Sequence, residues 1–331
     1  MKRVVCFGEL MLRLSPPGDE RLFQSPHLRT WFGGSEANVA AGIANLGGAA
    51  SCVTRLPDNA VGDAALAALR AEGIDVSGIL RGGERMGIYF VEPGAELRPM
   101  RVVYDRAGSA FSQIDPAELD WPRLLEDAEW LHLSGITPAL GGGPARAALD
   151  AAGAARPAGV KVSVDLNYRP ALWGGRDPKT VVPSLVRGCD LLVGNPGAAA
   201  AMLGVDSGDG DPHDPAFVRH AAERIAAEQG CRAVAITLRD VVSASEHRWS
   251  AALWDGAELH TARRWTVRVV DRVGGGDSFA AALIFAFQSG RRGADALEFA
   301  TAASALKLTI PGDFNRVSAA EVDRLLESTP A

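Results

Sequence analysis

Short apolar runs of strand length alternate along most of this chain with longer segments of helical composition. The predicted strands are Val4–Gly8, Leu10–Leu14, Ala50–Leu56, a strand near Ile79, Trp130–Ser134, Val160–Asn167, Asp190–Val193 and Ala233–Leu238. The predicted helices are one that Ser35 caps and that ends at Leu46, Val61–Glu72, Pro144–Ala155, a short helix near Ala198, Pro215–Gln229, one that holds Asp277 and the apolar run Ala280–Phe287, Asp295–Lys307 and Ala319–Glu327. This pattern is typical of a mostly parallel sheet flanked by helices.

Two segments depart from the alternation. Gly87–Glu92 and Arg101–Arg106 have strand composition and are joined by a Pro/Gly turn, which predicts a hairpin outside the main sheet. Asp206–Pro215 is acidic and rich in Gly and Pro, but a calcium loop needs a glutamate at its twelfth position, where this chain has Phe217. We therefore expect a solvated surface loop there. With no internal repeat and no linker-like segment, the sequence predicts a single domain over residues 1–331.

Composition narrows the class of partner. The chain has 331 residues, 47% of them hydrophobic and 22% charged, with a net charge of −6 and a pI near 5.6. This balance gives no reason to expect nucleic acid or an acidic membrane as partner, so a small molecule is favoured. The four cysteines form no CxxC pair, no secretory signal is visible, and no apolar run approaches the ~18 residues that span a bilayer. We expect a cytoplasmic protein with reduced thiols.

The candidate chemistry centres on a glycine-rich stretch that precedes a buried helix. Gly274, Gly275 and Gly276 offer unobstructed backbone N–H groups, and Asp277 falls in the first helical turn. Since a helix N-terminus carries partial positive charge, this stretch predicts an anion hole with a carboxylate on its rim that could accept a proton. The alternative is a tight turn in which Asp277 only caps the helix.

Polar residues also gather at the carboxyl ends of predicted parallel strands, where open α/β sheets place their ligands. Alternation puts Asp165, Asn167 and Arg169 on one side if their strand persists. Asn195 follows the apolar residues Leu191–Val193, and Thr237 and Arg239 follow the apolar residues Ala233–Ile236, so all of these side chains could converge on one crevice. The alternative for the first group is a strand end with a salt-bridged arginine.

The familiar nucleotide and hydrolase motifs are absent from the sequence. It has neither a GxxxxGK[ST] loop nor the GxGxxG spacing of a dinucleotide fold, and neither a GxSxG elbow nor an HExxH helix. The six histidines form no ligand-spaced pair. Any phosphate is therefore bound by another kind of loop.

Three motifs, in their order and separation, resemble the ribokinase-like (PfkB) carbohydrate kinases: Gly33-Gly34-Ser35-Glu36-Ala37-Asn38, Asp165-x-Asn167-x-Arg169 and Asp271-x-x-Gly274-Gly275-Gly276-Asp277. The similarity covers nearly the whole chain. It implies a three-layer α/β/α sandwich with a small β-sheet lid, and ATP and Mg²⁺ as cofactors. It also implies that Asp277 is the base and that the amides of Gly274, Gly275 and Gly276 stabilise the transferred phosphoryl group. By the same likeness Gly33, Gly34 and Asn38 face the sugar, whereas Asn167, Asn195, Thr237 and Arg239 lie along ATP.

Within the family, the details resemble 2-keto-3-deoxygluconate kinases. Matching positions are Tyr89, Tyr104, Arg106, Arg169 and, less closely, Asp313. The resemblance implies phosphorylation of 2-keto-3-deoxygluconate to 2-keto-3-deoxy-6-phosphogluconate, under a lid formed by about residues 10–30 and 86–110. Because a guanidinium binds a carboxylate through two parallel hydrogen bonds, Arg106 and Arg169 form the pair that would select a sugar acid. The alternative for Arg106 is a charge that protects a hairpin edge.

The chain departs from the family pattern at one position near the phosphates. Members often carry an acid three positions after the residue matching Asn195, and this chain has Ala198 there, so the metal ligands cannot be assigned from the sequence. Two other functions stay open: a catalytically weak relative that only binds a sugar acid, and a kinase of a neutral sugar such as fructose or ribose. Pairing of exposed lid sheets predicts a homodimer.

Overall fold

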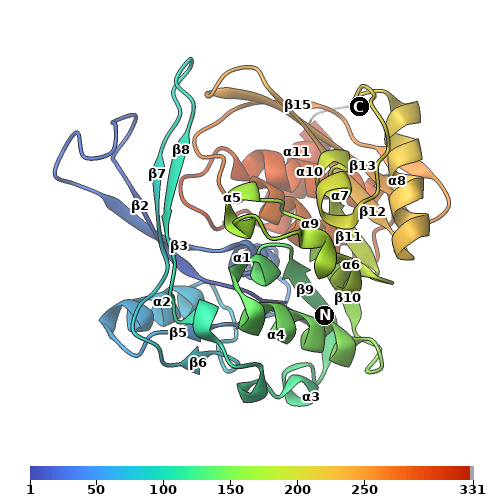
Figure 1. Ribbon diagram of the computed structural model, residues 1–331. Helices are drawn as coiled ribbons and strands as arrows, with labels where there is room; N and C mark the ends of the chain where they lie inside the picture. Colours follow the sequence, from blue (N-terminus) through green and yellow to red (C-terminus); the bar gives the residue numbers. More distant parts are fainter. Residues whose placement is uncertain (329–331) are drawn as a thin grey trace.

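A nine-stranded sheet forms the centre of the protein in the computed structural model, which describes residues 1–328 (Figure 1). Its order is β14-β13-β12-β11-β10-β9-β1-β4, and β15 also pairs with β13. The strands from β4 to β12 are parallel, and β13 is antiparallel to β12. The bounds are β1 Arg3–Phe7, β4 Ala50–Val53, β9 Ala128–Ser134, β10 Lys161–Asp165, β11 Leu191–Gly194, β12 Val234–Val241, β13 Glu246–Trp254, β14 Leu259–Thr261 and β15 Trp265–Arg268.

Helices cover both faces of this sheet. On one face lie α1 Ser35–Asn45, α2 Ala60–Ala71, α9 Gly275–Gln288, α10 Gly293–Lys307 and α11 Ala319–Ser328. On the other lie α3 Trp121–Leu124, α4 Gly142–Ala155, α5 Pro170–Trp173, α6 Val182–Val186, α7 Pro196–Leu203 and α8 Pro215–Gln229. Alternate residues of β1 enter different cores, since Val4 and Cys6 pack on the first face and Val5 and Phe7 on the second. The three-layer α/β/α prediction is confirmed.

A separate four-stranded sheet stands beside this body, with the order β3-β2-β7-β8 (Figure 1). Its strands are β2 Met11–Ser15, β3 Arg29–Gly33, β7 Ile88–Glu92 and β8 Arg101–Asp105. The antiparallel pairing of β7 with β8 confirms the predicted hairpin, and Phe90 lies opposite Val103 in its register. We call β3, β2, β7 and β8 together the small sheet.

The sequence pattern missed or misplaced several elements. The predicted strand Ala50–Leu56 is two strands, because the chain leaves the main sheet after β4 and β5 (Arg55–Leu56) pairs with β6 (Leu80–Arg81) instead. The antiparallel strands β13, β14 and β15 were not predicted, since they end the sheet without the strand and helix alternation that identified the others. Within residues 1–328, no helix has both the length and the apolar composition that a membrane span requires.

Candidate active site

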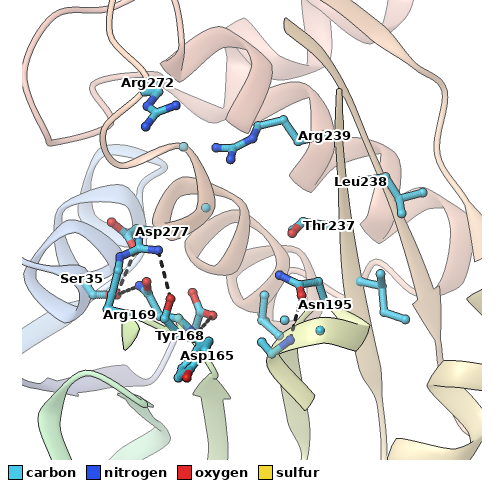
Figure 2. Close-up of a pocket in the computed structure, with 18 of the residues that line it drawn as sticks. Ser35, Asp165, Tyr168, Arg169, Asn195, Thr237, Leu238, Arg239, Arg272 and Asp277 are labelled. Carbon is cyan, nitrogen blue, oxygen red and sulfur yellow. Dashed lines mark hydrogen bonds between the residues drawn. The ribbon is translucent and has the colours of Figure 1, made fainter. Parts of the chain in front are cut away.

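One cavity of about 1180 Å³ brings the predicted site residues together at the carboxyl ends of β10, β11 and β12 (Figure 2). Its wall includes Gly34, Asn38, Tyr89, Tyr104, Arg106, Asn167, Arg169, Asn195, Thr237, Arg239, Gly274, Gly275, Gly276, Asp277 and Asp313. Gly33 is not among the lining residues, but it lies close to one of them, since a Cβ at its position would be 2.5 Å from Asp313 Cγ. The motifs that are far apart in the sequence thus share one cavity.

Asp277 is held by a neighbouring helix. Gly274, with φ of 81°, is the N-cap of α9, and Asp277 lies buried in the first turn. Its Oδ1 accepts a hydrogen bond of 2.9 Å from Ser35 Oγ, and its Oδ2 accepts one of 2.7 Å from Asn38 Nδ2. The carboxylate therefore has a role beyond capping its own helix. The prediction that Ser35 caps α1 was wrong, because Gly34 occupies the N-cap and the Ser35 hydroxyl points to Asp277.

The surroundings of Asp277 set its proton affinity. Burial raises the pKa of its carboxyl above the usual value, while the hydrogen bonds from Asn38 and Ser35 and the charge of Arg169 lower it. These opposing effects keep a buried carboxylate available to accept a proton at the cavity wall.

Three arginines give the same part of the cavity a positive charge. Arg169, Arg239 and Arg272 all line it, and Figure 2 shows Arg169 beside Asp277, with the other two across the cavity. The pKa of Arg239 is lowered first by desolvation and then by repulsion from Arg169. The pKa of Arg272 is lowered first by desolvation and then by repulsion from Arg239 and Arg169. Crowded like charges at the N-terminus of a helix form a site for an anion with several charges. The sequence prediction missed Arg272, although it stands just before the glycines.

Strands β10, β11 and β12 position the other polar residues of the cavity. Asn195 Oδ1 caps α7 by accepting the N–H of Ala198 at 2.9 Å. The prediction that Thr237 and Arg239 follow the end of their strand was wrong, because both lie within β12, which continues to Val241. The strand does not persist as far as the alternation of Asp165, Asn167 and Arg169 required, although all three side chains line the cavity. β10 ends at Asp165, whose carboxylate accepts the Asn167 N–H at 3.0 Å, and Asn167 takes a left-handed φ of 36°. The turn, rather than strand alternation, aims these side chains at the cavity.

The acidic segment that we expected to be only a surface loop also forms part of the wall. Asp206, Asp209 and His213 are among its residues that line the cavity. The loop is largely exposed, in agreement with its composition, but its position beside α7 gives it a place at the site. No motif in the segment indicated this, because contacts with distant residues, such as that of His213 with Asp240 on β12, hold the loop in place.

Arg106 is buried in the wall and paired. Its guanidinium donates from Nε to Glu9 Oε2 at 2.9 Å and from a terminal nitrogen to the same oxygen, while Ser109 Oγ donates to Glu9 Oε1. Only 8% of Arg106 is exposed, so the alternative of a protective charge on an exposed hairpin edge was wrong. Glu9, which the sequence reasoning did not select, fixes the orientation of this arginine.

Tyr89 and Asp313 form a buried pair at the same end of the cavity. The Tyr89 hydroxyl donates to Asp313 Oδ2, and Arg13 donates to the other carboxylate oxygen at 3.3 Å. Burial raises the pKa of Asp313 to about 6, against the lowering effect of Arg13. The Tyr89 ring stacks on Tyr104 with centroids 6.0 Å apart, which provides an apolar surface next to Arg106.

Glu36 is a further buried carboxyl group beside the site. Its Oε1 accepts hydrogen bonds of 2.6 Å from Ser134 Oγ and 2.9 Å from Thr137 Oγ1. Burial is the main cause that raises its pKa to about 7. Since a Cβ on Gly8 would meet its carboxylate at 2.0 Å, the side chain is enclosed by backbone as well. Glu36 joins the first turn of α1 to the end of β9.

We expect Glu36→Gln to weaken the pH dependence of stability. The folded-state pKa near 7 lies above that of an unfolded glutamate, so the contribution of Glu36 to stability is fully present below pH ~4 and is lost as the pH rises through about 7. From pH ~5 to pH ~8, the free energy of unfolding of the wild type should fall by ~2 kcal/mol more than that of the variant. Urea denaturation at several pH values measures this difference, and parallel curves for the two proteins would contradict it.

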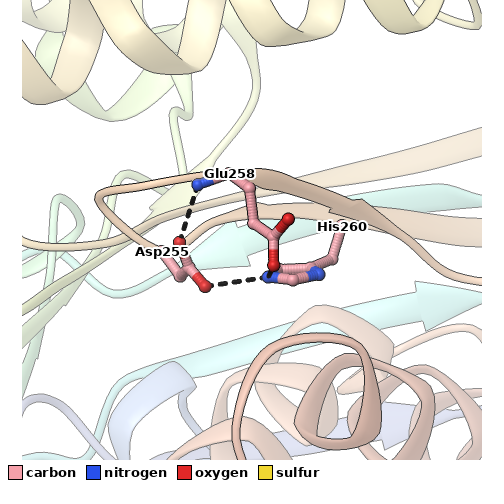
Figure 3. Close-up of side chains that lie close together, drawn as sticks. All are labelled: Asp255, Glu258 and His260. Carbon is pink, nitrogen blue, oxygen red and sulfur yellow. Dashed lines mark hydrogen bonds and ion pairs between the residues drawn. The ribbon is translucent and has the colours of Figure 1, made fainter.

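A second group of side chains lies away from the cavity, where β13 turns into β14 (Figure 3). The ligand atoms of Asp255, Glu258 and His260 lie within 4.8 Å of one another. Asp255 Oδ1 accepts the N–H groups of Ala257 and Glu258, both at 3.0 Å, and Asp255 Oδ2 is 2.8 Å from His260 Nε2. These bonds explain the cluster as the closure of a hairpin turn.

Comparison with known proteins identifies relatives along almost the full chain. Residues 1–319 match the model of the pfkB family of carbohydrate kinases. A 2-dehydro-3-deoxygalactonokinase from Haloferax volcanii is 32% identical over 328 residues, which cover 99% of this chain and 98% of the relative. A 2-dehydro-3-deoxygluconokinase from Thermoproteus tenax is 30% identical over 337 residues, which cover 99% of this chain and 95% of the relative.

A solved structure agrees with these relatives. The crystal structure of a 2-dehydro-3-deoxygluconokinase from Thermotoga maritima is 43% identical and superposes with a TM-score of 0.94, covering 98% of this chain and 97% of the other. The similarity therefore extends over the sheet, both helical layers and the small sheet.

Proposed function

Since this chain belongs to the pfkB family of carbohydrate kinases, we propose that it transfers the γ-phosphoryl group of ATP to a hydroxyl of a 2-dehydro-3-deoxy sugar acid. The substrate that we favour is 2-keto-3-deoxygluconate, with 2-keto-3-deoxy-6-phosphogluconate as product. The names of the two relatives and of the solved structure support an acid of this type. They differ in the configuration of the sugar, so the galactonate isomer belongs in the same assay.

The observation that carries this proposal is the position of Asp277. A buried carboxylate stands at the N-terminus of α9, in a cavity that also holds Arg169, Arg239 and Arg272. Proton acceptance and anion binding are the two requirements of phosphoryl transfer to an alcohol, and here they meet at one helix end.

In this mechanism Asp277 accepts the proton of the sugar hydroxyl as that oxygen attacks the γ-phosphorus, the bond from the γ-phosphorus to the β,γ-bridging oxygen breaks, and ADP leaves. The N–H groups around Gly274, Gly275 and Gly276 and the positive end of α9 stabilise the negative charge that develops on the transferred group. The small sheet forms the lid over the sugar, and its closure excludes water that would otherwise hydrolyse ATP. Asn195, Thr237 and Arg239 also line the cavity, and in this proposal they bind ATP.

The carboxylates of the cavity fit Mg²⁺ even though Ala198 offers no ligand. Asp165 and Asp277 both line the wall, and burial together with the charge of Asp277 raises the pKa of Asp165 to about 7. A divalent cation relieves such repulsion between carboxylates. Asp165 would hold the ion together with phosphate oxygens and water, and the ion supplies neutralisation of phosphate charge when it is bound.

A direct assay tests the proposal. The protein is supplied with ATP, Mg²⁺ and 2-keto-3-deoxygluconate, its galactonate isomer, fructose or ribose, and phosphorylated products are measured. Product from the sugar acids at a higher kcat/KM than from the neutral sugars is the expected result. Preference for fructose or ribose would establish the neutral-sugar kinase instead, and binding of the acid without product under any divalent metal would establish the inactive relative.

We expect Arg169→Ala to reduce the preference for the sugar acid. Arg169 is exposed to the cavity beside Asp277, and within residues 1–328 its guanidinium donates only to the adjacent carbonyl of Tyr168, at 3.5 Å. The guanidinium can therefore bind the substrate carboxylate. The ratio of kcat/KM for 2-keto-3-deoxygluconate to that for fructose should fall about tenfold. Arg239→Ala is the control, because loss of a nucleotide contact should lower both values and leave the ratio unchanged. An unchanged ratio in Arg169→Ala would mean that this arginine does not read the carboxylate.

A further inference from the structure

The Ser35 hydroxyl lies between two residues of the site that belong to different parts of the chain. It donates to Asp277 Oδ1 at 2.9 Å, and it accepts a hydrogen bond of 2.9 Å from Asn167 Nδ2. Ser35 is the first residue of α1 and is 8% exposed, Asn167 follows β10, and Asp277 is in α9. Figure 2 shows Ser35 beside Asp277 at the edge of the cavity.

The chemistry of the three groups gives this chain of hydrogen bonds one direction. The Asn167 amide nitrogen can only donate, so the Ser35 oxygen must accept that bond. Ser35 has a single hydroxyl hydrogen, and with its oxygen engaged by Asn167 this hydrogen points to Asp277. Asn167 therefore orients the Ser35 hydroxyl, and the hydroxyl stabilises the ionised form of Asp277.

The local backbone makes this arrangement specific. Asn167 has a left-handed φ of 36°, and its N–H is held by Asp165, so its side chain leaves the end of β10 in a fixed direction. Asn38 donates to the second oxygen of Asp277, and its own Oδ1 accepts the Gly34 N–H at 3.3 Å. Both oxygens of the carboxylate are thus oriented by the first turns of α1.

We propose that Ser35 is a positioning residue, which orients Asp277 and transmits to it the state of Asn167 on the nucleotide side of the cavity. This inference rests on the proposed function, in which Asp277 is the base and Asn167 lies along ATP. When ATP engages the Asn167 amide, the hydrogen bond to Ser35 changes, and the proton affinity of the base changes with it. Binding of ATP and the proton affinity of Asp277 are then linked through the Ser35 hydroxyl.

Ser35→Ala is a clean test, because the N-cap of α1 is Gly34 and no cap bond of the helix depends on the Ser35 side chain. Ser278→Ala is the matched control: Ser278 is also buried and follows Asp277 directly, but its hydroxyl contacts Asn315 and the Ala303 carbonyl. Each variant removes one buried serine hydroxyl, and only the Ser35 hydroxyl is bonded to Asp277. Thermal unfolding reports whether each variant is folded.

The readout is the acid limb of the pH profile of kcat/KM for the sugar, which reports the pKa of the base in the free enzyme. In Ser35→Ala this limb should move upward by about one pH unit, with activity on the high-pH plateau within about threefold of the wild type. In Ser278→Ala the limb should stay in place. An acid limb that is the same in Ser35→Ala and in the wild type would overturn the proposal.

A double-mutant cycle tests the link to Asn167. Asn167→Ala should shift the acid limb in the wild-type background and cause no further shift in the Ser35→Ala background. Equal shifts in both backgrounds would overturn the proposal that Asn167 acts on Asp277 through Ser35. Turnover of a sugar acid by the wild type is measured first, so failure of the proposed function shows as absence of product, whereas failure of this inference shows as unchanged pH profiles in an active enzyme.

Discussion

Replacing Asp277 by asparagine is expected to lower kcat by about 10²-fold or more, with a smaller change in the affinity for sugar and ATP. The amide keeps the size of the side chain but cannot accept the proton of the sugar hydroxyl. It also offers one oxygen where the carboxylate offers two, so the bonds from Ser35 and Asn38 cannot both be kept. Steady-state kinetics with titration calorimetry separate the loss in turnover from a loss in binding.

The matched control for Asp277→Asn is Glu36→Gln, which neutralises another buried carboxyl near the site. Glu36 is bonded by Ser134 and Thr137, and none of its bonds reaches Asp277. Its replacement should change kcat by less than about fivefold at pH ~8, because no proton transfer is assigned to it. A kcat near the wild-type value in Asp277→Asn would show that Asp277 is not the base.

Gly274→Ala is expected to destabilise the fold by ~3 kcal/mol or more and to lower kcat/KM by about 10²-fold. Gly274 has φ of 81°, and a Cβ there would lie 2.2 Å from the Asp313 carbonyl oxygen. Because that obstacle is backbone, relief requires movement of the loop that presents the N–H groups to the phosphoryl group. Chemical denaturation and steady-state kinetics measure the two effects.

Gly276→Ala provides the comparison for this change. Gly276 lies two residues later, in the first turn of α9. Nothing lies within 4 Å of a Cβ at its position, and its φ lies outside the left-handed region. Alanine in the first turn of α9 should leave the free energy of unfolding unchanged or raise it by about 0.5–1 kcal/mol. Equal stability of the Gly274→Ala variant and the wild type would show that the loop adapts to the added methyl group.

The alternation of apolar strands and helices was enough to predict a mostly parallel sheet between two helical layers. Such a sheet has continuous apolar strands, as at Val4–Phe7, and this local pattern persists in the fold. The antiparallel strands β13, β14 and β15 did not follow that pattern. Their pairing depends on which edge of the sheet is left open, and this is a property of the assembled sheet.

The sequence by itself also placed an aspartate after three glycines at a helix start and polar residues at strand ends, because backbone geometry fixes both at short range. The partners of these groups were decided by tertiary structure: Ser35 and Asn38 hold Asp277, Glu9 holds Arg106, and Arg272 completes the positive charge of the cavity. Hydrogen bonds and charge interactions act over a few ångströms, so they depend on which distant segments the fold brings together. The sequence indicated the chemistry, and the packing of α1 against α9 decided how the base is held.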